Sequence, residues 1–137
     1  MNFIDKLKEM DACKPAIKWA ENYGTLDEAW AACERGDWMM WLIGRTCTKS
    51  SPEHIALVRL SCRIARDVLP HVPVGELRPI KAIEAAEKWC DAPTEENAAA
   101  AEAAAYAAAR AAAKAALKKY AGWTREAFPN PPKIGDE

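Results

Sequence analysis

The chain has 137 residues, of which half are hydrophobic and 28% are charged, and its formal net charge is −1. This length fits one domain that buries about two-thirds of the surface of its unfolded chain. The balance of 19 basic against 20 acidic residues argues against general nucleic-acid binding. No apolar run approaches the roughly 20 residues of a membrane-spanning helix, and the N-terminus lacks the apolar stretch of a signal peptide. We therefore expect a cytoplasmic protein with no membrane partner.

The five cysteines are scattered singly, and no two of them form a Cys-x-x-Cys pair. An odd number without clustering is typical neither of a disulfide framework nor of a zinc site. The two histidines, His54 and His71, have no metal-ligand spacing between them. We expect reduced thiols in the core, no metal and no cofactor.

Helical periodicity begins at the N-terminus. Apolar side chains recur at helical spacing over residues 3–10 and again over residues 16–23, where Pro15 suits a first helical turn and Gly24 an end. Thr25 and Glu28 form a capping box, which predicts a third helix directly behind them.

A break follows at Gly36. This glycine suits a left-handed helix end, and Asp37 suits the N-cap of a helix that starts at Trp38. Ser51-Pro52 predicts the start of another helix, which continues to about Leu69. That helix is apolar on most faces, so we expect it at the centre of a bundle.

The last third of the chain predicts two more helices. Arg78 with the proline after it opens the first of them, and Thr94 caps the second. Fifteen of the nineteen residues from 98 to 116 are alanine, the best helix former, and Gly122 is the expected end of this long helix. Its smooth surface favours packing within the chain or a dimer interface.

No alternating run long enough for a strand occurs. We predict an all-α fold. It is a single compact bundle of about six helices over residues 1–128, with a long alanine-rich C-terminal helix and a proline-rich tail at 129–137.

Catalytic motifs are sparse. The six glycines are isolated, so no phosphate-binding loop is predicted, and no spacing singles out a cysteine with a histidine as a nucleophile and base. We expect no enzyme activity.

The arginines leave two interpretations open. Arg66 belongs to a row at positions i, i+4 and i+7 of the central helix, and other arginines lie at helix ends. Arginine can bind a phosphate or an acidic partner through two parallel hydrogen bonds. It can equally pair within the chain, with Glu34, Asp37, Glu84 or Glu87, and we favour that interpretation.

Residues 30–42 hold three of the six tryptophans and two of the four methionines. Trp38, Trp41 and Arg45 share one face of a helix, while the methionines cover another. Burial in the core is the favoured interpretation. Partial exposure would instead indicate a binding surface, where tryptophan, arginine and methionine are enriched.

Two segments resemble a known family. Residues 26–42 contain the pattern W-x-x-C-x-R-x-D-W-M-x-W-L, which is similar to that of small bacterial and phage proteins described as immunity proteins. Residues 78–89, followed by the alanine-rich segment, are similar to the second motif of that family. The resemblance spans residues 26–116. It implies a helical, non-catalytic protein, and it provides no catalytic residue to transfer.

The leading hypothesis is a non-catalytic protein that binds and sequesters another protein, either a toxin or a host-defence component. One alternative is a small ligand-binding protein or enzyme that uses an arginine-edged pocket. Another is a structural homo-oligomer, such as a homodimer packed through the alanine-rich helix. The candidate partner-binding residues are Arg35, Asp37, Trp38, Arg45, Arg59, Arg63 and Arg78.

Overall fold

The computed structural model describes residues 2–48, 50–68, 78–94 and 117–134. They form seven helices and no strand: α1 (Phe3–Glu9), α2 (Lys14–Ala20), α3 (Leu26–Ala32), α4 (Gly36–Thr46), α5 (Pro52–Val68), α6 (Arg78–Asp91) and α8 (Leu117–Ala127). The all-α prediction is confirmed for these residues, although the helices outnumber the six expected. The alanine-rich stretch 98–116 lies outside the described residues, so its long helix stays a prediction.

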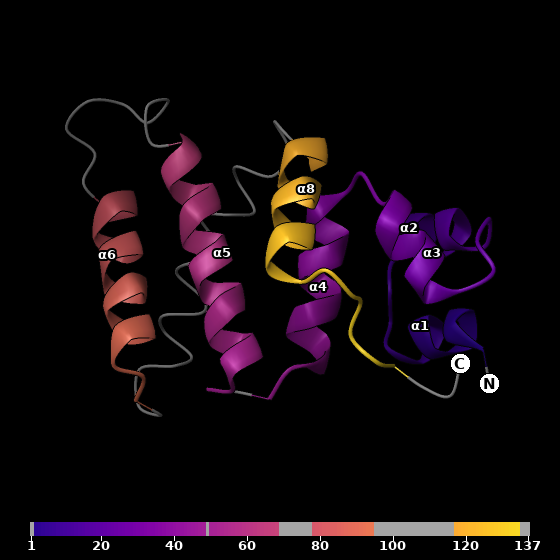
Figure 1. Cartoon of the computed structure of the whole chain (residues 1–137), viewed down its shortest axis with the longest axis horizontal. Coiled ribbons are helices and arrows are strands. Elements are labelled where there is room, and N and C mark those ends of the chain that lie inside the picture. The colour runs from indigo at the N-terminus through magenta and orange to yellow at the C-terminus, as the bar shows by residue number, and fades with distance from the viewer. Residues whose placement is uncertain (1, 49, 69–77, 95–116, 135–137) are drawn as a thin grey trace.

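The longer helices stand side by side. Figure 1 shows α6, α5 and α8 in that order, with α4 next to α8 and the short helices α1 to α3 beyond α4. Helix α5 packs against α6 on one side and against α4 and α8 on the other. Its central position agrees with its nearly all-round apolar sequence.

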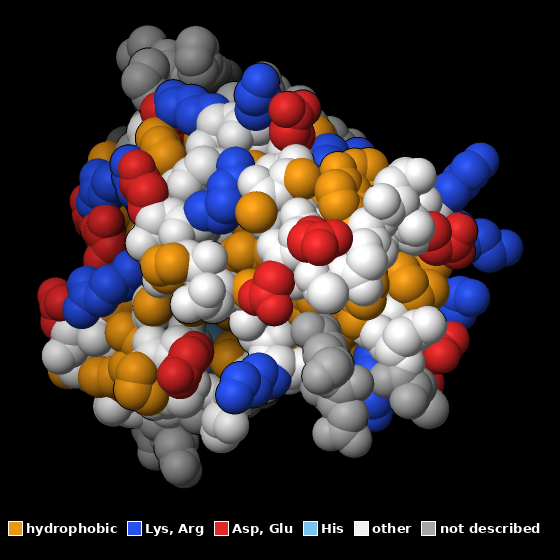
Figure 2. Space-filling model, turned by 45° about the vertical axis from the view of Figure 1, so that its right-hand side comes forward, with side chains coloured by type: hydrophobic (Ala, Val, Ile, Leu, Met, Phe, Trp, Pro, Cys, Tyr) orange, Lys and Arg blue, Asp and Glu red, His pale blue; other side chains and the backbone are white. Residues whose placement is uncertain are grey.

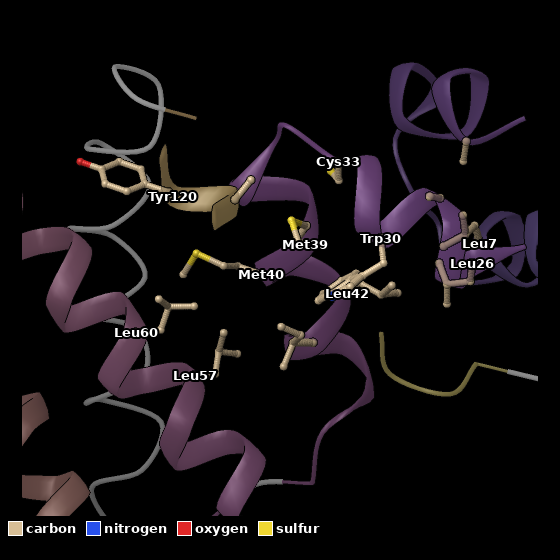
Figure 3. Packing of buried hydrophobic residues seen from close by; sticks show 14 of the residues in the cluster. Leu7, Leu26, Trp30, Cys33, Met39, Met40, Leu42, Leu57, Leu60 and Tyr120 are labelled. Carbon is tan, nitrogen blue, oxygen red and sulfur yellow. The ribbon is translucent and has the colours of Figure 1, made fainter. Parts of the chain in front are cut away.

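Two hydrophobic clusters hold the described helices together. The larger one includes Trp30, Met40 and Leu42 together with Leu57 and Leu60 of α5 (Figure 3). The smaller cluster lies between α5 and α6 and is composed of Val58, Cys62, Ala65, Ile83, Ala86, Trp89 and Cys90. Because α5 contributes to both clusters, it connects α6 to the rest of the fold.

Local capping accounts for two of the predicted helix starts. The Thr25 hydroxyl accepts a hydrogen bond from the Glu28 N–H at 3.2 Å, and the Glu28 carboxylate accepts one from the Gly24 N–H at 3.1 Å. The Ser51 hydroxyl accepts from the His54 N–H at 3.2 Å. These side chains satisfy N–H groups that the first turn of a helix leaves without partners.

A break separates α3 from α4 as predicted, but it lies at residues 33–35 and not at Gly36. Helix α4 begins at Gly36 itself, Arg35 occupies the N-cap position, and Asp37 lies inside the first turn. The reason is tertiary contact, because a Cβ at Gly36 would lie 2.8 Å from the Ala121 nitrogen and the Tyr120 carbonyl carbon. The glycine therefore allows α4 to approach the backbone of α8 and does not serve as a left-handed helix end.

The predicted helix end at Gly122 is also wrong. Helix α8 continues through this residue to Ala127. Tyr120, Ala121 and Thr124 are buried around the glycine, and the Thr124 hydroxyl donates to the Tyr120 carbonyl at 2.7 Å. Packing of this face therefore outweighs the low helix propensity of a single glycine.

The segment after α8 returns to the larger cluster. The buried Trp30 donates its indole N–H to the Phe128 carbonyl at 2.9 Å, and Phe128 and Ile134 pack against the cluster. Figure 1 shows this segment running from the end of α8 towards α1. Part of the predicted tail, as far as Ile134, thus contributes to the packing.

Candidate functional site

A cleft of about 690 Å³ opens between α4 and the three N-terminal helices. Leu7, Trp19, Leu26 and Leu42 bring one apolar side chain each from α1, α2, α3 and α4 to its lining. Clefts of roughly 300–1,000 Å³ with mostly apolar walls are the usual size of binding sites. We therefore treat this cleft as the candidate functional site.

Helix α2 supplies the wall opposite α4. Its Trp19 is half-buried, and its ring centroid lies 5.9 Å from that of Trp38 and 4.8 Å from that of Tyr23. On either side of Trp19 the wall is formed by Ala16 and Ala20, which also line the cleft. Because alanine side chains are short, they leave open space between the two helices.

Helix α4 divides the tryptophan and methionine cluster between two environments. Met39 and Ile43 are each 2% exposed and belong to the core. On the other face Trp38 is half-buried and Trp41 is 36% exposed, and both line the cleft. The favoured interpretation as core is thus right for the buried methionines, which border the cleft from below its surface, whereas Trp38 is only partly buried and Trp41 is exposed.

Arg35 is held in place at the edge of the cleft. Its Nε and Nη2 donate to the two carboxylate oxygens of Asp37 at 2.9 and 2.7 Å, and its guanidinium lies 4.3 Å from the centroid of a Trp38 ring. The hydrogen bond to Asp37 raises the pKa of Arg35. This pair is bidentate and nearly neutral as a unit.

Arg45 also lies at the edge of the cleft, but its contacts differ from those of Arg35. Its Nη2 donates to the Met10 carbonyl at 3.2 Å, and its guanidinium lies 5.9 Å from the centroid of the Trp41 ring. No carboxylate of the described residues comes within 4.0 Å of it. The cleft therefore has one guanidinium neutralised within the chain and one with donors available to a ligand.

Four of the seven predicted site residues meet at this cleft: Arg35, Asp37, Trp38 and Arg45. The other three do not. Arg59 pairs with Asp91 at 3.0 Å, and Arg78 opens α6 with a side chain outside the description. Arg63 pairs with Glu126 at 3.0 Å and lies 3.8 Å from a ring centroid of Trp123. Arg59 and Arg63 of α5 thus pair within the chain, which is the interpretation favoured from the sequence.

Three tryptophans of the cleft lining were missing from the predicted site residues, namely Trp19, Trp41 and the buried Trp30. Trp41 belonged to the noted cluster, and its i, i+4 spacing to Arg45 was a usable signal. Trp19 lies on a regular apolar helix face, which sequence alone assigns to the core. Only the contact between α2 and α4 reveals its position.

The buried thiols are not activated nucleophiles. Cys33, Cys62 and Cys90 are free thiols, and burial raises the pKa of Cys33 and Cys90 and raises that of Cys62 to about 12. A raised pKa keeps a thiol protonated and unreactive at neutral pH. Cys13 is exposed and lines the cleft.

No three histidine, cysteine or carboxylate groups among the described residues lie close enough to hold a metal ion. None of their helices is both long and apolar enough to cross a membrane.

Comparison of the chain with protein-family models, curated proteins and solved structures found no match. The similarity to immunity proteins therefore stays a proposal.

Proposed function

We propose that this chain is a non-catalytic, cytoplasmic binding protein that sequesters another protein, either a toxin or a host-defence component. The partner docks at the cleft between α2 and α4. The observation that carries this proposal is the pair Trp38 and Trp41, which lie open to the cleft with arginine guanidinium groups against their rings. Tryptophan and arginine are the residue types most often found at energetic centres of protein interfaces.

The surroundings of the cleft support binding by complementarity. Figure 2 shows hydrophobic side chains interspersed with groups of both charges over one side of the molecule, without a broad region of a single sign. Interfaces between proteins are of this mixed kind, with an apolar centre and a polar rim. A polyanion such as nucleic acid would require a positive surface instead.

The arrangement of ionisable groups supports the non-catalytic part of the proposal. At the cleft, Arg35 and Asp37 neutralise each other. A catalytic site usually brings together groups whose pKa values are shifted towards the working pH. The buried thiols are shifted in the opposite direction, away from neutral pH.

The alternative of a pocket edged by the α5 arginines loses support, because Arg59, Arg63 and Arg66 all pair with carboxylates of the chain. The alternative of a homo-oligomer depends on residues 98–116. We retain the proposal that they form a long helix completing a single bundle. Light scattering over a hundredfold range of concentration tests for a dimer, and a persistent monomer rules it out.

The test of the main proposal is co-expression of the chain with each protein encoded beside its gene. At least one of these proteins should be toxic alone and neutralised by the chain. Trp41→Ala should abolish the rescue, because it removes a large side chain from the cleft while Trp41 contributes little to the core. Lys88→Ala, on exposed α6 surface, is the control that keeps the rescue.

Two results contradict the proposal. One is a failure to neutralise any neighbouring protein. The other is a rescue that Trp41→Ala leaves intact while circular dichroism shows the variant to be folded.

A further inference from the structure

The two arginines at the edge of the cleft differ in what they can still bind. Both carboxylate oxygens of Asp37 are occupied by Arg35, so that guanidinium has little capacity for another anion. Arg45 donates to a single carbonyl, that of Met10, and the described residues offer it no carboxylate. With five N–H donors in its guanidinium, it retains the capacity for a bidentate ligand.

Arg45 is also already oriented. Contact with the Trp41 ring and the hydrogen bond to Met10 restrain its side chain at the mouth of the cleft. An arginine held in this way loses less conformational entropy when it binds a carboxylate. The apolar wall of the cleft begins directly beside it, at Trp41.

We infer that the cleft recognises an acidic segment of the partner protein, in which a carboxylate binds the Arg45 guanidinium and a neighbouring apolar side chain enters between Trp19 and Trp41. This inference rests on the proposed function and specifies the chemistry of the partner. It requires one carboxylate beside one large apolar side chain.

The remaining charges of the rim limit how acidic the segment can be. Asp37 is neutralised by Arg35, but Asp11 also lines the cleft and repels negative charge. A phosphate group or a nucleic-acid backbone would bring several negative charges close to this carboxylate. A single glutamate or aspartate at Arg45 meets less of this repulsion.

The geometry of α4 also sets a spacing for the partner. Trp41 and Arg45 are four residues apart on one helix, which separates them by about 6 Å along the axis. A partner helix presents an apolar residue and a glutamate over the same distance when they are three or four positions apart. An amphipathic helix with this spacing is the occupant that we expect.

The test uses the full chain and two synthetic 14-residue helical peptides with capped ends. Both carry leucine and phenylalanine at the same positions; one has glutamate four residues from the phenylalanine, and the other has glutamine there. Titration calorimetry should show that the glutamate peptide binds about fivefold more tightly, the scale of a partly exposed charge pair. Arg45→Gln should remove this preference, and the distant control Lys88→Gln should keep it.

Each contrary outcome is informative. Equal binding of the two peptides that still depends on Trp41 overturns the acidic chemistry but leaves the proposed function in place. The inference is also overturned if neither peptide binds, or if the preference for glutamate persists in Arg45→Gln. Failure of the co-expression rescue, by contrast, removes the proposed function itself.

Discussion

Gly36 lies where the first turn of α4 meets the backbone of α8. A methyl group there would be placed 2.8 Å from two backbone atoms, and backbone cannot move aside as a flexible side chain can. At Gly122, one turn before the end of α8, no atom lies within 4 Å of the equivalent position. Two glycines in helices therefore have opposite steric environments.

We predict opposite effects of alanine at these positions. Gly36→Ala should lower the free energy of unfolding by about 1–3 kcal/mol, because it overpacks the contact between α4 and α8. Gly122→Ala should raise it by about 0.5–1 kcal/mol, since alanine favours the helix and meets no neighbour. Urea denaturation of both variants measures the two changes. A stable Gly36→Ala variant would contradict the close approach of α4 to α8.

At the scale of helices, Arg125 of α8 donates hydrogen bonds to the C-terminal end of α3. Its Nη1 donates to the carbonyls of Trp30 and Cys33 at 3.2 and 2.6 Å. The last carbonyls of a helix lack partners within the helix, and here a side chain from another element supplies them. Arg125 thus links α8 to α3, which forms part of the wall of the cleft.

Replacement of this arginine by methionine tests the link. Arg125→Met retains most of the side-chain volume but removes the donor to the Cys33 carbonyl, while the Trp30 carbonyl keeps its bond from the Cys33 N–H. The variant should therefore cost about 1–3 kcal/mol of unfolding free energy. Lys118→Met is the matched control, because its ion pair with Glu34 spans 3.5 Å between side chains that are 81% and 65% exposed. Losing such a pair should cost less than about 1 kcal/mol. Thermal unfolding measures the loss of stability in both variants. Equal losses would count against the capping role of Arg125.

The starts of α3 and α5 were predictable from sequence because their caps are local. Thr25 and Ser51 bond to N–H groups three residues away, and the chain displays that spacing directly. The glycines were not predictable, because their roles depend on α8. Gly36 is defined by residues 84 and 85 positions later in the chain, and no local pattern contains that information.

The same distinction applies to the candidate site. Arg35, Asp37 and Trp38 were predicted as site residues because they adjoin a single helix with a strong pattern. Trp19 was missed, because its contact with Trp38 joins two helices separated by a third. The pairing of Arg63 with Glu126 likewise spans 63 positions, so the sequence could suggest a carboxylate partner without identifying it.

At the scale of the whole molecule, the described helices place the cleft beside the main core and away from α6. Helices α4, α5 and α8 contact one another directly, and α6 packs on the far side of α5. The walls of the cleft come from α4 and from the short helices α1 to α3. A partner bound in the cleft would therefore contact α2 and α4 and leave α5 and α6 untouched.

Hydrogen–deuterium exchange of the chain alone and with its neutralised partner tests this claim most directly. Bound partner should slow amide exchange in α2 and α4, over residues 14–20 and 36–46, because its contacts suppress the local opening through which helix amides exchange. Exchange in α5 and α6 should change little. Slower exchange confined to residues 52–68 and 78–91 would contradict the account and place the binding surface on the opposite side of the molecule.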